Sequence, residues 1–393
     1  MQITAGKQGF LWLTMAAVAL STVQFAVVQA AAPNKYRVYI GTYTGKQSKG
    51  IYAAEFDPAT GALSEPQLVA ETPSPSFLAL SPDNSHLYAV NELGKFNGEA
   101  AGSITAFAVD AASGQLKQLN QQSTRGAHPC HVIVDGKGDH ALVANYTGGN
   151  LIVFPINQQG ELEEASSFVQ HSGSGGDPRR QKGPHAHSIN LDPAEQFAVA
   201  ADLGLDQVLI YRFEDGKLTP NEPAFAKLAP AAGPRHFAFH PSGKFAYVIN
   251  ELNSTITVFK YDAQRGSLTE VQTLSTLPAD FEGNNSTAEV QVHPSGKFVY
   301  GSNRGHNSIA SFSVDPDSGK LTSTGHCPSG GSTPRNFKVD PSGKFVLAAN
   351  QQTNNIAVLR VDPASGKLSP TESSVEVGAP VCIKFVPLSA SGN

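Results

Sequence analysis

One short pattern recurs along this chain and restricts its fold more than any other feature. A turn made of a glycine, any residue and then a leucine, usually a few residues after an acidic residue, recurs at near-regular intervals, starting at Gly61, Gly114, Gly160, Gly216, Gly266, Gly319 and Gly366. Successive copies are 53, 46, 56, 50, 53 and 47 residues apart. A period of about 50 residues, with short alternating strands between turns, is typical of an all-β propeller whose repeats are four-stranded blades.

A second marker gives the register within each repeat. A hydrophobic strand ends at Pro82, Pro193, Pro241, Pro294, Pro341 and Pro387, with Gly136 at the equivalent point of one copy. Nine residues after the marker comes an amide or an acid, namely Asn91, Asn145, Asp202, Asn250, Asn303 or Asn350. The Pro-Ser-Gly-Lys segments predict tight turns, because proline fixes φ and glycine admits positive φ. Each repeat is therefore expected to contain an innermost, a second and a third strand and, after the Gly-x-Leu turn, an outer strand.

The two ends of the repeat region complement each other. Residues 381–386 form an innermost strand with no strand after it, and residues 36–40 form a second strand with none before it. Joined in one blade, they remove open sheet edges, which otherwise invite aggregation. We therefore predict a seven-bladed β-propeller over residues 31–393, closed by a composite blade from both termini.

Residues 1–30 resemble a secretory signal peptide. Lys7 and the amino terminus carry positive charge, residues 10–28 are mostly apolar, and Val28-Gln29-Ala30 offers small residues for cleavage. An uncleaved anchor is the alternative, because the apolar stretch is nearly long enough to span a bilayer. We expect a periplasmic domain without stable membrane insertion after cleavage.

Composition narrows the range of partners. A net charge of −5 gives no basic field for nucleic acid. Cys130, Cys327 and Cys382 are odd in number and lack metal-ligand spacing, so they predict neither a disulfide framework nor a metal site. We expect Cys382 to be a small buried residue and Cys130 to serve packing. A monomer is expected, since the outer strands carry solvated charges.

The register predicts which residues meet at one mouth of the propeller, where innermost strands begin and second strands end. A first ring contains Ser76, Cys130, His187, Arg235, Ala288, Arg335 and Val381. The next ring contains Phe77, His131, Ser188, His236, Glu289, Asn336 and Cys382. The ends of the second strands add Glu92, Tyr146, Leu203, Glu251, Arg304 and Gln351.

Charges of both signs in one concave place indicate a functional site, and a network of salt bridges that closes the channel is the structural alternative. A hard-cation site is also conceivable, because four carboxylates lie near the mouth: Glu92, Asp202, Glu251 and Glu289. The interleaved arginines count against it, and we predict no metal.

The connection over residues 171–185 is long, basic and rich in glycine. It is either a lid that brings Arg179, Arg180 or Lys182 over a polar ligand, or a solvated surface loop. Its Gly-Ser-Gly-Gly segment is not followed by Lys-Ser/Thr and precedes no helix, so a phosphate-binding loop is rejected.

Several segments around this mouth carry a family resemblance. They are Pro184-His-Ala-His-Ser188, Ala232-Gly-Pro-Arg-His236, Phe239-His-Pro241, Val248-Ile-Asn-Glu-Leu-Asn253 and Thr333-Pro-Arg-Asn-Phe337. They resemble the motifs of bacterial 6-phosphogluconolactonases of the seven-bladed propeller type, along essentially the whole mature chain. The same superfamily includes fungal carboxymuconate-lactonizing enzymes. Their implicated histidine, two arginines and glutamate correspond by motif to His187, Arg235, Arg335 and Glu251.

The resemblance implies that water opens a sugar lactone without a metal or an organic cofactor. Arg235 and Arg335 suit stabilisation of the oxyanion. Either Glu251 or His187 would activate the water, and the other would orient it or protonate the leaving oxygen. The predicted substrate-binding residues are His236, His185, Glu92, Glu289, Arg304 and Arg179. No serine or cysteine nucleophile with an adjacent base is evident, so direct hydrolysis is expected.

The predicted export bears on the substrate, because 6-phosphogluconolactone is an intracellular metabolite. We therefore expect hydrolysis of unphosphorylated glucono-1,5-lactone to the aldonic acid in the periplasm. The alternatives are a 6-phosphogluconolactonase, a muconolactone-type cyclase or hydrolase, and a non-catalytic binding propeller.

Overall fold

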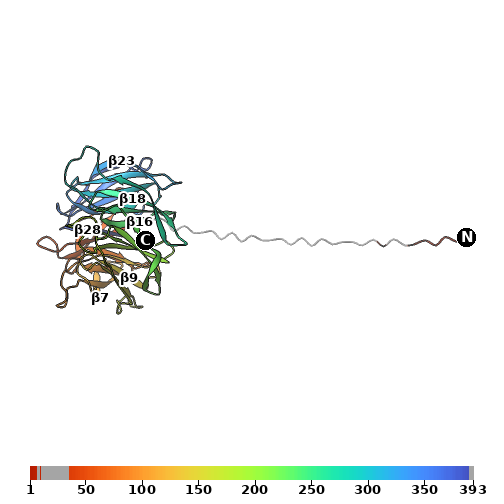
Figure 1. Cartoon of the computed structure of the whole chain (residues 1–393), viewed down its shortest axis with the longest axis horizontal. Coiled ribbons are helices and arrows are strands. Elements are labelled where there is room, and N and C mark those ends of the chain that lie inside the picture. Colours follow the sequence, from red (N-terminus) through yellow and green to blue (C-terminus); the bar gives the residue numbers. More distant parts are fainter. Residues whose placement is uncertain (7–8, 10–34, 389–393) are drawn as a thin grey trace. The chain divides into compact units, whose positions relative to one another are not determined.

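In the part of the chain that the structure describes, twenty-eight β-strands build seven four-stranded antiparallel sheets, one for each predicted repeat (Figure 1). The computed structural model describes residues 1–6, 9 and 35–388, and every regular element in these ranges is a strand. This arrangement confirms the all-β, seven-bladed propeller. The predicted signal peptide falls mainly on residues outside this description and stays a prediction. In the described ranges, no helix is long and apolar enough to cross a membrane.

The strands fall into four concentric sets. The innermost strands are β4 (Phe77–Leu80), β8 (Pro129–Val134), β12 (Ala186–Leu191), β16 (Pro234–Phe239), β20 (Ser286–Val292), β24 (Pro334–Val339) and β28 (Pro380–Leu388). The second strands are β1 (Lys35–Thr42), β5 (His86–Asn91), β9 (His140–Asn145), β13 (Phe197–Asp202), β17 (Phe245–Asn250), β21 (Phe298–Arg304) and β25 (Phe345–Asn350). The third strands are β2 (Gly50–Phe56), β6 (Ser103–Val109), β10 (Asn150–Pro155), β14 (Gln207–Glu214), β18 (Thr255–Asp262), β22 (Ser308–Val314) and β26 (Asn355–Val361). The outer strands are β3 (Gln67–Glu71), β7 (Leu116–Ser123), β11 (Ser167–Gln170), β15 (Lys217–Lys227), β19 (Ser267–Ser275), β23 (Leu321–Pro328) and β27 (Leu368–Glu376).

The composite blade forms as predicted. Its strand order is β28-β1-β2-β3, so the last described strand supplies the innermost position. The pairing of β28 with β1 runs from Lys35 opposite Leu388 to Thr42 opposite Pro380. The first and last described strands therefore lock together, and the ring has no open edge at their junction.

The Gly-x-Leu turn also fastens neighbouring blades together. Gly319 has φ +71°, and a Cβ atom there would clash with the Phe245 ring of the preceding blade. In the same pair of blades, the Tyr247 hydroxyl donates to the carbonyl oxygen of Gly319 at 3.2 Å. Tyr39, Tyr88 and Tyr300 make the same bond to the equivalent glycines. The Gly-x-Leu repeat therefore forms a packing contact between blades as well as a turn.

The asparagine that recurs at the end of the second strand has a structural role in three of the blades. Asn145, Asn303 and Asn350 are completely buried. Their amides donate to carbonyl oxygens of the preceding connection, at Thr124 (3.0 Å), Thr276 (2.8 Å) and Ser329 (2.9 Å). These bonds hold the start of each innermost strand beside the end of its second strand.

The apolar core lies between the blades. Val199 and Val208 of one blade pack with Val248 and Phe259 of the next, and similar clusters join the other blades. Because these contacts supply the buried apolar area, the channel-facing positions of the innermost strands can hold polar side chains.

Candidate active site

β-Bulges determine which side chains reach the mouth. The pairing of innermost and second strands skips a residue at Cys130, His187, Arg235 and Arg335. A bulge re-aims side chains that strict alternation would send to opposite faces. Arg235 and the next residue, His236, consequently line the same cavity. The two predicted rings therefore form one site.

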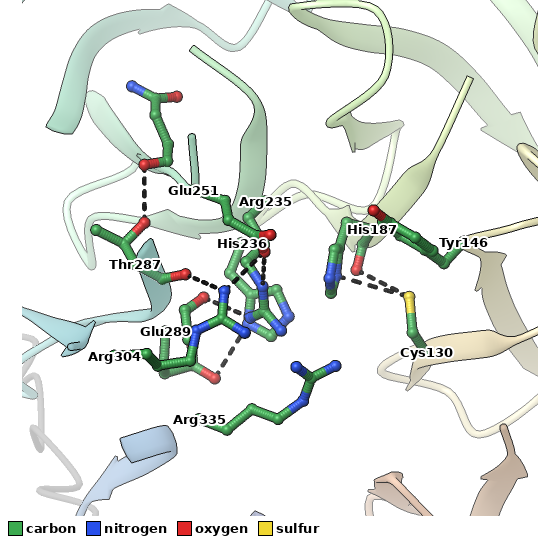
Figure 2. Close-up of polar contacts among 12 residues, drawn as sticks. Cys130, Tyr146, His187, Arg235, His236, Glu251, Thr287, Glu289, Arg304 and Arg335 are labelled. Carbon is green, nitrogen blue, oxygen red and sulfur yellow. Dashed lines mark hydrogen bonds and ion pairs between the residues drawn. The ribbon is translucent and has the colours of Figure 1, made fainter. Parts of the chain in front are cut away.

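Glu251 is held by three arginines, of which Figure 2 shows Arg235 and Arg304. Its Oε2 accepts from Arg235 Nε at 3.0 Å and from Arg304 Nη2 at 2.8 Å, and its Oε1 accepts from Arg180 Nη2 at 2.9 Å. Burial alone would raise the pKa of Glu251, but the three guanidinium groups lower it to about 2. The carboxylate is therefore ionised at neutral pH and is a poor proton acceptor.

Arg335 belongs to a second chain of polar contacts at the mouth. It donates from Nη2 to the Tyr43 hydroxyl at 2.8 Å, and Tyr43 donates to Glu92 Oε2 at 2.8 Å. The guanidinium carbon also lies 5.3 Å from the centre of the Tyr43 ring. Burial would lower the pKa of Arg335, but Tyr43 and the nearby carboxylates raise it. Arg335 is therefore a fixed positive charge.

His187 is oriented by Cys130. The Cys130 Sγ lies 3.6 Å from His187 Nδ1 and 3.5 Å from the backbone carbonyl oxygen of His187. Two further carbonyl oxygens, of Ala186 and Ala144, lie 3.7 and 3.8 Å from the sulfur. The single thiol proton can go to Nδ1 or to one of these three carbonyl oxygens, and in the second case the sulfur accepts from His187 Nδ1–H. We assign the proton of neutral His187 to Nδ1, which leaves a lone pair on Nε2.

The charge state of His187 agrees with this assignment. Burial, then Arg235 and His236, hold its pKa well below 6.5. Figure 2 shows its ring between Tyr146 and the arginine cluster. At neutral pH the ring is uncharged and available to accept a proton.

A deeper polar layer supports the mouth. His236 Nδ1 lies 3.1 Å from Glu289 Oε2, and Asn336 also donates to that oxygen. Burial lowers the pKa of His236 although Glu289 opposes the shift. The buried Nε2 of His236 has no partner among the described residues. Glu289 therefore positions His236 and lies below the mouth itself.

The cavity between these groups is very small. Its volume is about 10 Å³, and its lining includes Tyr43, Cys130, Arg235, His236 and Arg335. That is about the room that one water molecule needs. A six-membered lactone cannot enter unless a side chain moves.

Residues 171–185, which we call the cap loop, are fixed at both ends by one buried carboxylate. Asp202 accepts from His171 Nδ1 at 2.6 Å and from the backbone N–H of His185 at 2.7 Å. His171 Nε2 is in turn 3.0 Å from the Tyr211 hydroxyl. The ends of the cap loop are therefore anchored to the fourth blade.

The middle of the cap loop is anchored by Asp206. Its carboxylate accepts from the backbone N–H of Gly176 at 3.0 Å and from Gln181 Nε2 at 2.6 Å. Arg180, next to this anchor, extends to Glu251 and to the Tyr146 hydroxyl, 3.1 Å away. The cap loop thus behaves as an ordered part of the site, unlike a free surface loop.

Most of the residues predicted to form the site lie at or near the mouth. His187, Arg235, Glu251 and Arg335 meet at the mouth. The nearby predicted binders are Glu92, Arg304, His236 and, stacked on Tyr146 at 4.6 Å, His185. Arg179 is exposed, and its neighbour Arg180 takes the place that we expected for it. This difference arises because residue 180 precedes the anchored Gln181.

Two residues of the site were not predicted from the sequence. Cys130 was expected to serve packing and Tyr43 was not singled out, although both contact predicted site residues. The first-ring position of Cys130, directly before a channel histidine, was the available signal. Tyr43 lies past the end of β1 and carried no comparable pattern.

The four carboxylates considered for a cation have separate partners. Glu92 accepts from Tyr43, Glu251 from arginines, Glu289 from His236, and Asp202 from His171. In the part of the chain that the structure describes, no group of three or more His, Cys, Asp or Glu is arranged to hold a metal ion.

The chain is similar to several known proteins. A family model described as a lactonase with a 7-bladed beta-propeller matches residues 37–385. The chain is 39% identical over 352 residues to a 6-phosphogluconolactonase of Bacillus subtilis, covering 90% of this chain and 99% of the relative. A 6-phosphogluconolactonase of Formosa agariphila is 35% identical, with 76% and 85% covered. The solved Pseudomonas aeruginosa periplasmic gluconolactonase is 36% identical, with a TM-score of 0.85 and 90% and 100% covered.

Proposed function

This chain belongs to the seven-bladed β-propeller lactonases and is a lactone hydrolase, and we propose that it hydrolyses glucono-1,5-lactone to the aldonic acid in the periplasm. The observation that carries the proposal is a neutral histidine, with Nε2 open, beside guanidinium groups held in place. Similarity to the periplasmic gluconolactonase and the signal-like residues 1–30 support the substrate and the compartment.

In the proposed reaction, His187 Nε2 takes a proton from water while the water oxygen attacks the lactone carbonyl carbon. Negative charge develops on the carbonyl oxygen, where Arg235 and Arg335 donate hydrogen bonds. When the intermediate collapses, the bond from the carbonyl carbon to the ring oxygen breaks. The ring oxygen takes the proton back from His187 and becomes a hydroxyl group. The new acid ionises beside the arginines.

Glu251 acts in this scheme as a positioning residue. Both of its oxygens are occupied by guanidinium groups, and its pKa is about 2. These observations favour His187 over Glu251 as the base. Glu251 holds Arg235 and Arg304 in place and balances part of their charge.

Substrate entry requires Arg180 to move in this proposal. Among the three arginines on Glu251, the Arg180 side chain is 45% exposed, whereas those of Arg235 and Arg304 are 2% and 12% exposed. The cap-loop arginine is the one with solvent to move into. It would then be free to contact the substrate.

A phosphorylated substrate is the second candidate. It is favoured by the similarity to the Bacillus subtilis 6-phosphogluconolactonase and by exposed Arg179 and Lys182 on the cap loop. Guanidinium and ammonium groups near the entrance would suit a phosphate.

The test is a comparison of kcat/KM for glucono-1,5-lactone, its 6-phosphate and a carboxylate-bearing lactone, with spontaneous hydrolysis subtracted. We expect the neutral sugar lactone to be preferred. A tenfold or greater preference for the phosphorylated lactone would favour the second candidate over glucono-1,5-lactone. A preference for the carboxylate-bearing lactone would favour muconolactone chemistry. Cell fractionation against a periplasmic marker tests the compartment separately.

A further inference from the structure

The central channel has a second cavity at the end opposite the mouth, where the innermost strands finish. We call it the far-end pocket. Its volume is about 310 Å³. Its polar lining comes from Gln291, Lys338 and Lys384, and its walls are apolar, including Val339 and Phe385. This composition, an apolar cavity with a few convergent polar groups, is typical of small-molecule sites.

Two lysine side chains line this pocket, and neither is fully paired. Lys338 Nζ donates to Gln291 Oε1 at 3.0 Å, and Lys384 Nζ lies 4.8 Å from the centre of the Phe77 ring. Among the residues that the structure describes, neither lysine forms an ion pair with a carboxylate. An ammonium group has three donors, so most of these N–H groups have no protein acceptor.

The closest relevant carboxylate is already engaged. Glu289 interacts with Lys338 through space, but its oxygens accept from His236, Asn336 and Gln291. Burial, followed by the charge of Lys384, lowers the pKa of Lys338 to about 8. The partners of Glu289 are uncharged, so its carboxylate offsets one of the two ammonium charges, and the other has no counter-ion among the described residues.

We propose that the far-end pocket binds a small organic carboxylate, with its oxygens between Lys338 and Lys384 and its hydrocarbon part against Val339 and Phe385. Two carboxylate oxygens match two ammonium groups. A phosphate would leave further charged oxygens against the apolar walls, where they would lack donors. A polyhydroxylated sugar acid would likewise find few partners besides Gln291. The ligand is therefore distinct from the proposed substrate and product.

The probe is 4-bromobenzoate, titrated calorimetrically into the purified protein, with neutral 4-bromobenzamide as the matched compound. The bromine atom locates the probe by anomalous diffraction. We expect binding of the carboxylate alone, in the far-end pocket. Lys338→Met and Lys384→Met should each weaken it by about tenfold or more, because each removes a charge-assisted hydrogen bond.

Two further variants make the outcome decisive. Lys344→Met removes an exposed lysine from a nearby turn, and Arg335→Ala removes a cation from the mouth; neither should change the affinity. Unchanged affinity in both pocket variants, equal binding of the amide, no binding at all, or bromine located at the mouth would each overturn the proposal. Lys338→Gln replaces Lys338→Met if the latter does not fold. Because the readout is affinity, these results do not depend on which lactone is hydrolysed.

Discussion

At the scale of single residues, the mouth separates charge that is fixed from charge that can change. Glu251 keeps its negative charge because three arginines surround it, whereas His187 is neutral and has one nitrogen oriented by a thiol. Glu251 and His187 are both potential proton acceptors, and their hydrogen-bond partners give them different roles. The following two predictions separate these roles.

Replacing His187 by Gln is expected to lower kcat/KM by about 10²- to 10⁴-fold, the usual loss for a general base. In the unaltered protein kcat/KM should fall as the pH drops through the pKa of His187, which lies below 6.5. That dependence should disappear with His187→Gln and persist, at lower overall activity, with Glu251→Gln. Steady-state pH profiles check this. The reverse pattern would identify Glu251 as the base.

Cys130→Ala is expected to lower kcat by about tenfold with little change in KM, since one hydrogen bond that orients the base is lost. Cys130→Ser keeps an acceptor for His187 Nδ1–H and should recover most of the activity. Nitrogen NMR of the His187 ring should report the Nδ1–H tautomer in the unaltered protein and a mixture in the alanine variant. An Nε2–H tautomer in the unaltered protein would contradict the assignment.

At the scale of elements, the cap loop and the Gly-x-Leu turns show two ways in which a connection is held. Carboxylates of Asp202 and Asp206 anchor the cap loop from beneath. The glycine turns are held by packing against the adjacent blade. The first arrangement leaves exposed side chains such as Arg180 available for binding, and the second fixes the spacing of the blades.

The adjacent arginines of the cap loop provide a matched pair. Arg180→Ala should change KM by about tenfold, because it removes a charge-assisted contact at the entrance. Arg179→Ala should stay within about twofold for a neutral lactone, because Arg179 is exposed and lies away from the mouth contacts. Equal effects of the two substitutions on KM would show that the charge of the cap loop matters but the position of the arginine does not.

Gly319→Ala is expected to lower the free energy of unfolding by about 1–3 kcal/mol, because alanine is strained at φ +71° and its Cβ would strike Phe245. Gly45→Ala is the control, since nothing lies within 4 Å of a Cβ added there. Urea denaturation of both variants measures the difference. Equal stability of the two variants would mean that neither the positive φ of Gly319 nor its contact with Phe245 contributes to stability.

The elements most accessible from sequence were those set by local periodicity. The Gly-x-Leu spacing gave the blades, and the Pro-to-Asn interval gave the strand register that brought His187 and Arg235 together. Partner choice was less accessible, because it depends on side-chain direction and on loop path. The selection of Arg180 over Arg179, for example, depends on the Gln181 anchor to Asp206. The contact of Cys130 with His187 likewise needs two bulges in adjacent blades.

At the scale of the whole molecule, buried uncharged histidines link stability to pH. Burial lowers the pKa of His131, His187 and His236 below 6.5. The unfolded chain therefore binds more protons than the folded chain as the pH falls below 6.5, and the folded state loses stability. The lowered pKa values of Glu251 and Glu289 act in the same direction, but only at more acidic pH.

The free energy of unfolding should consequently fall between pH 6.5 and 5, by at most about 4 kcal/mol per pH unit for three histidines. Urea denaturation at pH 7.5, 6.5 and 5.5 measures this slope. His131→Asn keeps an acceptor near the Ile189 N–H and should reduce the slope by about one third. A stability that is flat across this range would show that the three histidines titrate normally in the fold.

The pairing of β28 with β1 has a consequence for the order of assembly. The partner that completes the first blade is the last strand along the chain, so β1 must wait for it while the other blades form. Pairing elements so distant in sequence is entropically demanding and slow. Until that contact forms, the ring is a chain of blades with an unsatisfied edge at each end. The same junction that seals the finished molecule is therefore the point at which an unfinished one is most prone to join another copy.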